Sequence, residues 1–368
     1  MTTSTGILIL STVLCFSLLN VPLRSADNPP SKPAEQVFKN IQALKGVPSE
    51  QIIPAMQFIT ASLGVECDFC HVPGAFEKDD KKPKQTARKM MLMMFAINRD
   101  NFEGQRKVTC YSCHRGNHKP LDTPIVTEEP PASPEAGTAM RREPDSAFPS
   151  AEQIVERYVV ALGGKAAIQG VSSRIASGKA EIEGREFPTE IFYDHSNKIS
   201  TVIHLPNGEN VDSFNGRTGW VSFPGHSVRA MEPYEINGAR IDADLHLPLD
   251  LQQPGSEIRV ISAGKIGAEG TYMGTASWQG QPLDLYFDKD SGLLVRLVRY
   301  VESPLGRSPV QTDYSDYRQS GAVKIPFRWT VARPGGRFTI QLERVKENVA
   351  IEPARFEKPV AQEKTDGH

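Results

Sequence analysis

Cysteine is scarce in this sequence, with only five among 368 residues. Cys15 lies in an apolar N-terminal run, and the other four form two close pairs, Cys67 with Cys70 and Cys110 with Cys113. An even number of cysteines in an exported protein permits two disulfides. The spacing inside each pair, and the histidine that follows it, favour a different chemistry that is developed below.

An excess of charge of either sign is also missing. The chain has 42 Lys and Arg against 44 Asp and Glu, a formal net charge of -2. Such a balance gives no basic surface for a nucleic acid, so we expect no nucleic-acid partner. Hydrophobic residues make up 39% and charged residues 23%, which is typical of a globular protein. The length predicts two domains.

Long apolar runs are absent after the N-terminus, so no later segment is predicted to span a membrane. The run from Ile7 to Leu19 is short and leads to a small-residue site at Arg24-Ser25-Ala26. We therefore expect residues 1–26 to be a signal peptide and the mature protein to be periplasmic. The alternative is a retained N-terminal anchor, since no Lys or Arg precedes the run; it would leave the protein membrane-associated.

Proline divides the rest of the chain. Seven prolines fall between positions 120 and 149, and such a segment buries little and keeps a semi-extended backbone. We predict a first domain over 27–120, which contains both cysteine pairs, a proline-rich linker over 121–149, a β-rich domain over 150–360 and a polar tail over 361–368.

The predicted fold class is α+β with several domains. In the first domain apolar spacing predicts helices over 33–47, 49–63 and 84–98, and Gly46 and Gly64 are typical helix ends. The second domain begins with a helix over 151–162. Strand-like runs follow at 201–205, 283–287, 293–300, 323–331 and 337–345, without helical patterns between them. They predict a mainly antiparallel half-barrel, in which Phe338, Ile340 and Leu342 are buried and the alternating Thr339, Gln341 and Glu343 face water.

The chemistry lies in two copies of one motif, Cys67-Asp-Phe-Cys70-His71 and Cys110-Tyr-Ser-Cys113-His114. In a C-x-x-C-H segment two thioethers reach the two vinyl positions on one edge of a porphyrin, and the histidine becomes the proximal iron ligand. A zinc site is a competing interpretation of the same residues. A thioredoxin-like pair would need a βαβ pattern that the sequence lacks. The two motifs predict two covalently attached haem c groups.

A second axial ligand is expected for each iron, and methionine or histidine commonly supplies it. Met56, eleven residues before Cys67, precedes the first motif; the alternative is that Met56 only packs against the ring. Before the second motif, Met90 and Met94 share a helical stripe with Ala87 and Ile97, and the residues alone favour either methionine. His118 is a weaker candidate. The unit therefore occurs twice, as a helix bearing methionine followed by the haem motif.

The stretch from 67 to 120 resembles the cytochrome c subunit of photosynthetic reaction centres. The matching segments are Cys-Asp-Phe-Cys-His-Val-Pro-Gly (67–74), Ala-Arg-Lys-Met (87–90), Ala-Ile-Asn (96–98) and Val-Thr-Cys-Tyr-Ser-Cys-His-Arg-Gly (108–116). The resemblance implies Met56 as axial ligand of the first haem and Met90 of the second, with Met91, Met93 and Met94 as packing residues. Four-haem members of the family have two further motifs and a histidine before the second motif. Residues 99–109 contain no histidine, so the resemblance implies a two-haem version.

The C-terminal region is similar, more weakly, to the half-barrels of periplasmic lipoprotein-sorting carriers. The matching features are the Ile154–Gly164 helix ending in Leu-Gly-Gly, and Asp-Tyr-Arg (316–318) leading to Gly-Ala-Val-Lys-Ile-Pro (321–326). This resemblance implies an apolar ligand on the concave face, whereas the alternative is a purely structural β domain. Trp220, Trp278 and Trp329 either line such a cavity or belong to the core.

We predict a periplasmic electron carrier that transforms no substrate and exchanges electrons with redox partner proteins, among them a membrane-bound electron-transfer complex. Two alternatives stay open. One is a dihaem peroxidase-like enzyme, which needs an iron with an open coordination position. The other is a lipid- or lipoprotein-binding carrier whose haems act as a redox sensor.

Overall fold

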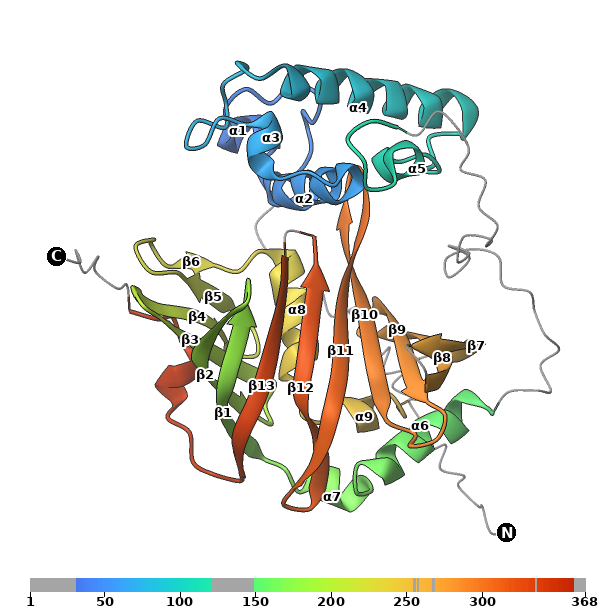
Figure 1. Cartoon of the computed structure of the whole chain (residues 1–368), viewed down its shortest axis with the longest axis vertical. Helices are drawn as coiled ribbons and strands as arrows, with labels where there is room; N and C mark the ends of the chain where they lie inside the picture. The colour runs from blue at the N-terminus through green and yellow to red at the C-terminus, as the bar shows by residue number, and fades with distance from the viewer. Residues whose placement is uncertain are drawn as a thin grey trace, which may run out of the picture.

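The computed structural model describes residues 31–120, 149–253, 256, 258–266, 269–334 and 336–360. The predicted signal peptide, the linker up to residue 148 and the polar tail lie outside the described residues. A helical N-terminal part sits above a large curved sheet (Figure 1). In the part of the chain that the structure describes, no helix has the length and hydropathy needed to cross a membrane.

The helical part consists of short segments around two longer helices. Its elements are α1 (Ala34–Val37), η1 (Ser49–Gln51), α2 (Ile52–Leu63), α3 (Cys67–Cys70), α4 (Lys82–Asn101) and α5 (Cys110–His114). The predictions over 49–63 and 84–98 are confirmed, with a 3-10 turn at the start of the first and a longer second helix. Gly64 ends α2 in the left-handed conformation, with φ +64°.

The helix predicted over 33–47 is wrong beyond Val37. Phe38 is extended and Asn40 has a left-handed backbone, with φ 60°. The Asn40 side chain donates hydrogen bonds to the Glu77 carbonyl and to Asp79 Oδ1. Contacts with a distant loop thus replace the helical hydrogen bonds that the apolar spacing suggested. Of the apolar residues in this segment, Leu44 is buried while Val37 is exposed.

The β part confirms the predicted fold class. Its helices are α6 (Ala151–Ala161), α7 (Lys165–Gln169), α8 (Pro233–Ala243), α9 (Leu247–Asp250) and η2 (Pro353–Phe356). Its strands are β1 (Ser173–Ile182), β2 (Arg185–Asp194), β3 (Lys198–Leu205), β4 (Gly208–Phe214), β5 (Gly219–Ser222), β6 (Arg229–Ala230), β7 (Arg259–Ile266), β8 (Glu269–Trp278), β9 (Gln281–Asp288), β10 (Leu294–Ser303), β11 (Gly306–Ser320), β12 (Val323–Arg333) and β13 (Gly336–Glu347).

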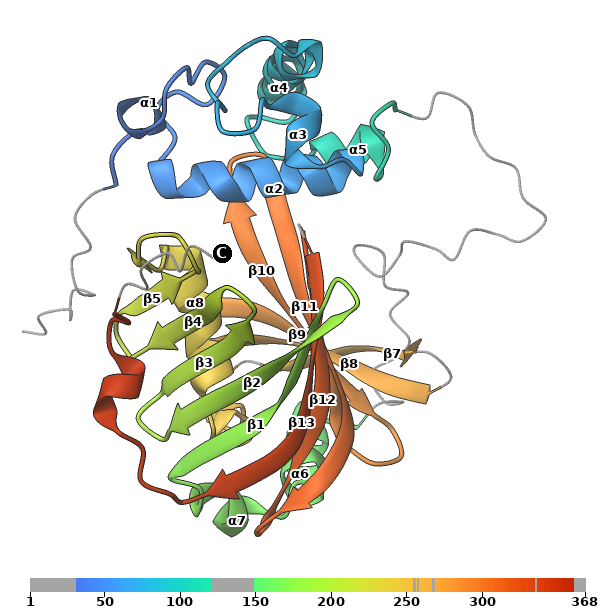
Figure 2. The ribbon, with the colours of Figure 1, turned by 60° about the vertical axis from the view of Figure 1, so that its left-hand side comes forward.

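All the described strands join one antiparallel sheet in the order β6-β5-β4-β3-β2-β1-β13-β12-β11-β10-β9-β8-β7. The chain runs outward from β1 to β6, crosses through α8 and α9 to the opposite edge, and returns from β7 to β13 beside β1. The expectation of no helices between the strands is therefore wrong, because α8 and α9 carry the chain from one edge of the sheet to the other. Figure 2 shows the sheet curving, with α8 on its concave side. The main core lies between this face and helices α6, α8 and α9, and includes Leu283, Leu285 and Phe287.

The five predicted strands are confirmed as β3, β9, β10, β12 and β13. The predicted alternation along β13 is only partly right, because Phe338 and Gln341 are both half-buried and Thr339 is buried rather than exposed to water. Its hydroxyl lies 2.8 Å from the hydroxyl of Thr330, its cross-strand neighbour on β12. A hydroxyl that has a hydrogen-bond partner can be buried at little cost in free energy. The polar face of β13 is therefore only partly exposed to solvent.

The two parts of the protein meet where the β10–β11 hairpin reaches α2 (Figures 1 and 2). Leu305 at its tip is fully buried and belongs to the core of the helical part. A Cβ at Gly306 would overlap the ring of Phe58. Arg106 donates to the Ser303 carbonyl and pairs with Glu302 at 2.7 Å. The hairpin therefore completes the core of the helical part with residues from the β part.

The tip leucine should contribute strongly to stability. Leu305→Ala should lower the free energy of unfolding by about 2–5 kcal/mol, because it leaves a cavity in a fully packed site. Chemical denaturation followed by circular dichroism measures this change. Leu92→Ala on the exposed face of α4 is the matched control, with an expected effect within about 0.5 kcal/mol. Equal effects of the two substitutions would contradict the importance of the hairpin contact.

Candidate haem site

The two motifs fold as single helical turns. Cys67–Cys70 form α3, after which His71 is extended. The second turn, α5, begins at a capping box between Thr109 and Ser112 and ends at Arg115, which has a left-handed backbone. All four cysteines are free thiols, so neither pair forms a disulfide. Burial raises the pKa of the Cys70 and Cys110 thiols.

Each motif histidine is oriented by a main-chain carbonyl. His71 Nδ1 lies 2.9 Å from the Phe76 carbonyl oxygen, and His114 Nδ1 lies 2.9 Å from that of Asn117. A carbonyl oxygen only accepts hydrogen bonds, so Nδ1 carries the proton in both rings. The lone pair is then on Nε2, the nitrogen left free to bind a metal. Sequence reasoning named both histidines but not these carbonyls.

The loop after the first motif is held by α4. Lys84, a buried lysine in the first turn of this helix, donates to the same Phe76 carbonyl at 2.8 Å and to the Lys78 carbonyl at 2.7 Å. Lys84 also pairs with Asp79 at 3.1 Å. Hydrogen bonds from Arg88, Asn40 and Lys84 hold the pKa of Asp79 well below its usual range. This network keeps the carbonyl that orients His71 in place.

The second motif is held at both ends. Before it, the buried Asn98 of α4 accepts from the main-chain N–H groups of Lys107, at 3.0 Å, and Val108, at 2.8 Å. Asn98 also donates to the Val108 carbonyl at 2.7 Å. After the motif, Gly116 N–H donates to the Ser62 carbonyl at 2.9 Å. A Cβ at Gly64 would overlap the Gly116 carbonyl oxygen, so this close approach requires glycine.

A cavity of about 440 Å³ lies between α4 and α5. This volume is in the range of ligand pockets, roughly 300–1,000 Å³. Its lining is mainly apolar and includes the second motif and a row of α4 residues: Pro83, Thr86, Ala87, Met90, Met91, Met93, Met94, Ile97, Cys110, Cys113 and His114. Two thiols, an imidazole and thioethers around an apolar space suit a covalently attached haem. The residues present therefore fit the predicted group at the second motif.

The four methionines of α4 differ in exposure. Met91 and Met94 are 7% and 5% exposed and belong to the core of the helical part, whereas Met90 and Met93 are 41% and 48% exposed. The burial of Met91 and Met94 agrees with the packing role implied by the resemblance, whereas the exposure of Met93 does not. The assignment of Met90 as axial ligand stays a prediction, with Met93 as a neighbour that lines the same cavity.

The first motif also borders this cavity. Phe69 and Cys70 line it, and the ring of Phe69 lies 5.9 Å from that of His118, which is exposed. Met56 and His71 are not among its lining residues. The helix that bears Met56, α2, packs against α5, and α3 packs against α4. The methionine-bearing helix that precedes each motif in sequence thus packs against the other motif. The pairing of Met56 with His71 stays a prediction.

The zinc interpretation gains no support. In the described ranges, no three His, Cys, Asp or Glu side chains gather as a metal site, although a structural zinc site uses four such ligands.

The family model for the photosynthetic reaction centre cytochrome C subunit matches residues 17–163. The reaction centre cytochrome c subunit of Thermochromatium tepidum is 35% identical over 102 residues, which cover 27% of this chain and 25% of that protein. The N-terminal part of this chain is therefore similar to the reaction-centre cytochromes. Cytochrome c-554 of Chloroflexus aurantiacus is 35% identical over 82 residues, 20% of each chain. The predicted family resemblance is confirmed, although this chain spans about a quarter of the length of the first relative.

Solved structures with a similar chain course include a DUF1329 family protein from Desulfovibrio piger and a LolA superfamily protein from Nitrosomonas europaea. The first has a TM-score of 0.39 at 12% identity and covers 57% of this chain and 98% of its own. The second has a TM-score of 0.40 at 12% identity and covers 57% and 99%.

The hydrogen bonds of Asn98 should stabilise the segment that precedes the second motif. Asn98→Ala leaves the main-chain groups before Cys110 without partners, so it should cost about 1–3 kcal/mol of stability. Thermal unfolding measures the loss. Asn101→Ala on the same helix removes an exposed side chain and is the control. A loss at Asn101 as large as that at Asn98 would contradict this role.

Proposed function

We propose that this chain is a periplasmic electron-transfer protein with two covalently attached haem c groups, each with histidine and methionine as axial ligands. The observation that carries the proposal is the pair of C-x-x-C-H turns whose histidines both donate through Nδ1 to a main-chain carbonyl. A hydrogen bond from Nδ1 to a carbonyl is typical of a histidine whose Nε2 binds a metal, and here both motif histidines make this bond. The similarity of the N-terminal part to reaction-centre cytochromes supports the same conclusion.

Each residue has a defined task in this proposal. Cys67, Cys70, Cys110 and Cys113 anchor the two groups, and His71 and His114 present Nε2 to the metal. Met56 and Met90 present thioether sulfurs, which favour a higher reduction potential than a second histidine. When bound, haem c supplies an iron that cycles between the ferrous and ferric states. The cavity beside the second motif offers the group a mainly apolar lining.

The proposal assigns the electron-carrying part to residues 27–120, joined through a linker over 121–149 to the β domain over 150–360. Export depends on the signal peptide over residues 1–26. We propose redox partner proteins, including a membrane-bound electron-transfer complex, because the relatives are subunits of photosynthetic reaction centres. A carrier is favoured over a peroxidase because a methionine helix accompanies each motif, and two axial ligands leave no open iron position.

The number of haems is directly testable. The pyridine haemochrome of protein made with a haem-attachment system should give two haems per chain, and Cys110→Ala with Cys113→Ala should leave one. Reduced-minus-oxidised spectra of the same samples serve as the control, because they show whether haem c is attached to the protein. A value below two for the unaltered chain would contradict the proposal.

The axial methionines can be separated by substitution. Met90→Ala should remove one iron-bound methionine signal from the nuclear magnetic resonance spectrum of the reduced protein and lower one reduction potential, because the thioether is lost. Met56→Ala should do the same for the other haem. Met93→Ala lines the same cavity and is the matched control, with both signals retained. Loss of a signal in Met93→Ala alone would transfer the ligand role to Met93.

A further inference from the structure

The β part supports helix α2 mainly at one place, the tip of the β10–β11 hairpin. Among the described strands, the contacts of α2 are chiefly with β10 and β11. At the tip, Leu305 is fully buried in the core cluster against which Met56 also packs. The side chain proposed as axial ligand of the first haem therefore shares its packing with a residue of the β part.

Gly306 sets the distance between the hairpin and α2. A Cβ at this position would overlap Cζ and both Cε atoms of the Phe58 ring. The φ of Gly306 is not positive, so other residues could adopt this backbone conformation. The ring of Phe58, rather than the backbone, is therefore the reason that this position requires glycine.

The geometry of the helix links this contact to Met56. Phe58 and Met56 are two residues apart on α2, so their side chains project about 200° apart, from nearly opposite sides of the helix. A push from the hairpin on Phe58 would therefore move α2 toward the side from which Met56 projects. Main-chain hydrogen bonds hold the two residues in one helical unit, so the displacement reaches Met56.

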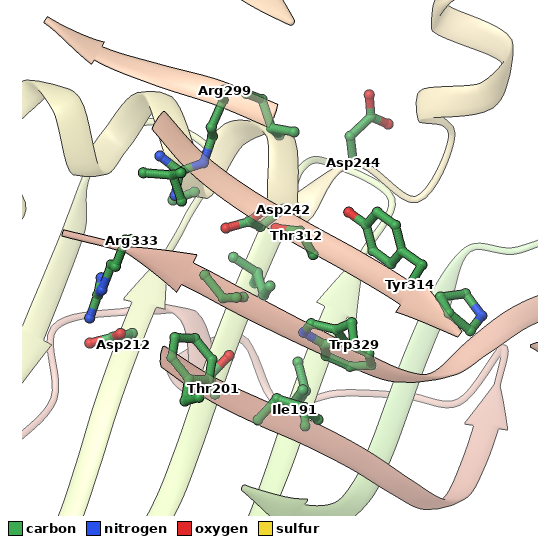
Figure 3. A pocket seen from close by; sticks show the side chains of 18 of the residues that line it. Ile191, Thr201, Asp212, Asp242, Asp244, Arg299, Thr312, Tyr314, Trp329 and Arg333 are labelled. Atoms are coloured by element: carbon green, nitrogen blue, oxygen red, sulfur yellow. The ribbon is translucent and has the colours of Figure 1, made fainter. Parts of the chain in front are cut away.

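Another side of α2 faces open space. Ile53 and Gln57 border a cavity of about 830 Å³ between the concave face of the sheet and α8. Figure 3 shows the charged side chains on the wall of this cavity, namely Asp212 of β4, Asp242 of α8, Arg299 of β10 and Arg333 of β12. Packed side chains of the sheet do not support α2 on this side. The hairpin is therefore the contact through which the β part fixes the position of α2.

The C-terminal end of α2 is held separately. The Ser62 carbonyl accepts a hydrogen bond from the Gly116 N–H at 2.9 Å, and Gly64 leaves room for the Gly116 carbonyl oxygen. A shift at Phe58 would thus tilt α2 about this fixed end. Met56 lies farther from the fixed end than Phe58 does, so a tilt displaces Met56 at least as far as Phe58.

The hairpin also contacts the segment before the second motif, but only through exposed groups. Arg106 pairs with Glu302 at 2.7 Å, and the two side chains are 37% and 61% exposed. An exposed ion pair contributes little to stability. The same segment is held independently by the hydrogen bonds of Asn98. The hairpin should therefore influence the first haem more than the second.

We propose that Leu305 and Gly306 are positioning residues for the first haem. Acting through Phe58, the hairpin holds α2, and with it Met56, in the position of an axial ligand. This inference rests on the proposed function, in which Met56 ligates the first iron. It gives the β part a task in electron transfer, because loss of the thioether lowers the reduction potential of that haem.

Gly306→Ala in the full chain with both haems tests this role. The nuclear magnetic resonance signal of the iron-bound methionine should be lost or shifted for the first haem and unchanged for the second, as assigned with Met56→Ala and Met90→Ala. Imidazole competes with methionine for ferric iron, and one haem should bind it at least about tenfold more tightly, as an overpacked contact would produce. The unchanged second haem reports that the variant is folded.

A matched control and a rescue accompany this variant. Gly264→Ala on β7, whose new Cβ would lie 3.8 Å from the nearest heavy atom, should change neither haem. Phe58→Leu removes the ring atoms that the new Cβ overlaps. The double variant Gly306→Ala with Phe58→Leu should therefore regain the first methionine signal and the imidazole affinity of the unaltered chain, even where Gly306→Ala alone fails to fold.

Three results would overturn the role of the hairpin: unchanged ligation in Gly306→Ala, equal changes at both haems, or no rescue in the double variant. Failure of the ligand assignment is distinguishable from these results. An unaltered chain without an iron-bound signal from Met56 contradicts the assignment of Met56. A chain that has this signal and keeps it in Gly306→Ala contradicts only the positioning role.

Discussion

Helix α4 holds both haem motifs through side chains at its two ends, and the candidate site depends on this constraint. Near its start, Lys84 bonds the carbonyl that orients His71. Near its end, Asn98 bonds three main-chain groups just before Cys110. The same helix presents Met90 and Met93 to the cavity beside α5. One rigid element therefore sets the positions of two short turns that have little internal structure of their own.

The helical part is not independent of the sheet. Leu305 closes its core from the β10–β11 hairpin, and Gly306 allows the Phe58 ring to lie against the hairpin backbone. Helix α2 consequently packs against both the helical core and the hairpin tip.

Local signals predicted part of the fold, whereas strands such as β1, β2 and β11 and helix α8 were not recognised. The helices at 49–63 and 84–98 and the five strands were recognisable because their apolar periodicity agrees with the packing that they find in the structure. The segment 33–47 has a similar apolar periodicity, but its packing does not follow it, because Asn40 forms a hydrogen bond with the loop that contains Asp79. That loop is distant in sequence, and the partner of Asn40 cannot be inferred from the residues next to it.

The sequence by itself determined the chemistry. Two C-x-x-C-H motifs predict haem attachment through covalent reach alone, which depends on a spacing of a few residues. Tertiary structure decided which atoms orient the histidines, which α4 methionines are buried, and how the two units interleave. It also decided that Asp212, Asp242, Arg299 and Arg333 share one cavity. These side chains come from four separate elements, and only the curvature of the sheet and the crossing of α8 bring them together.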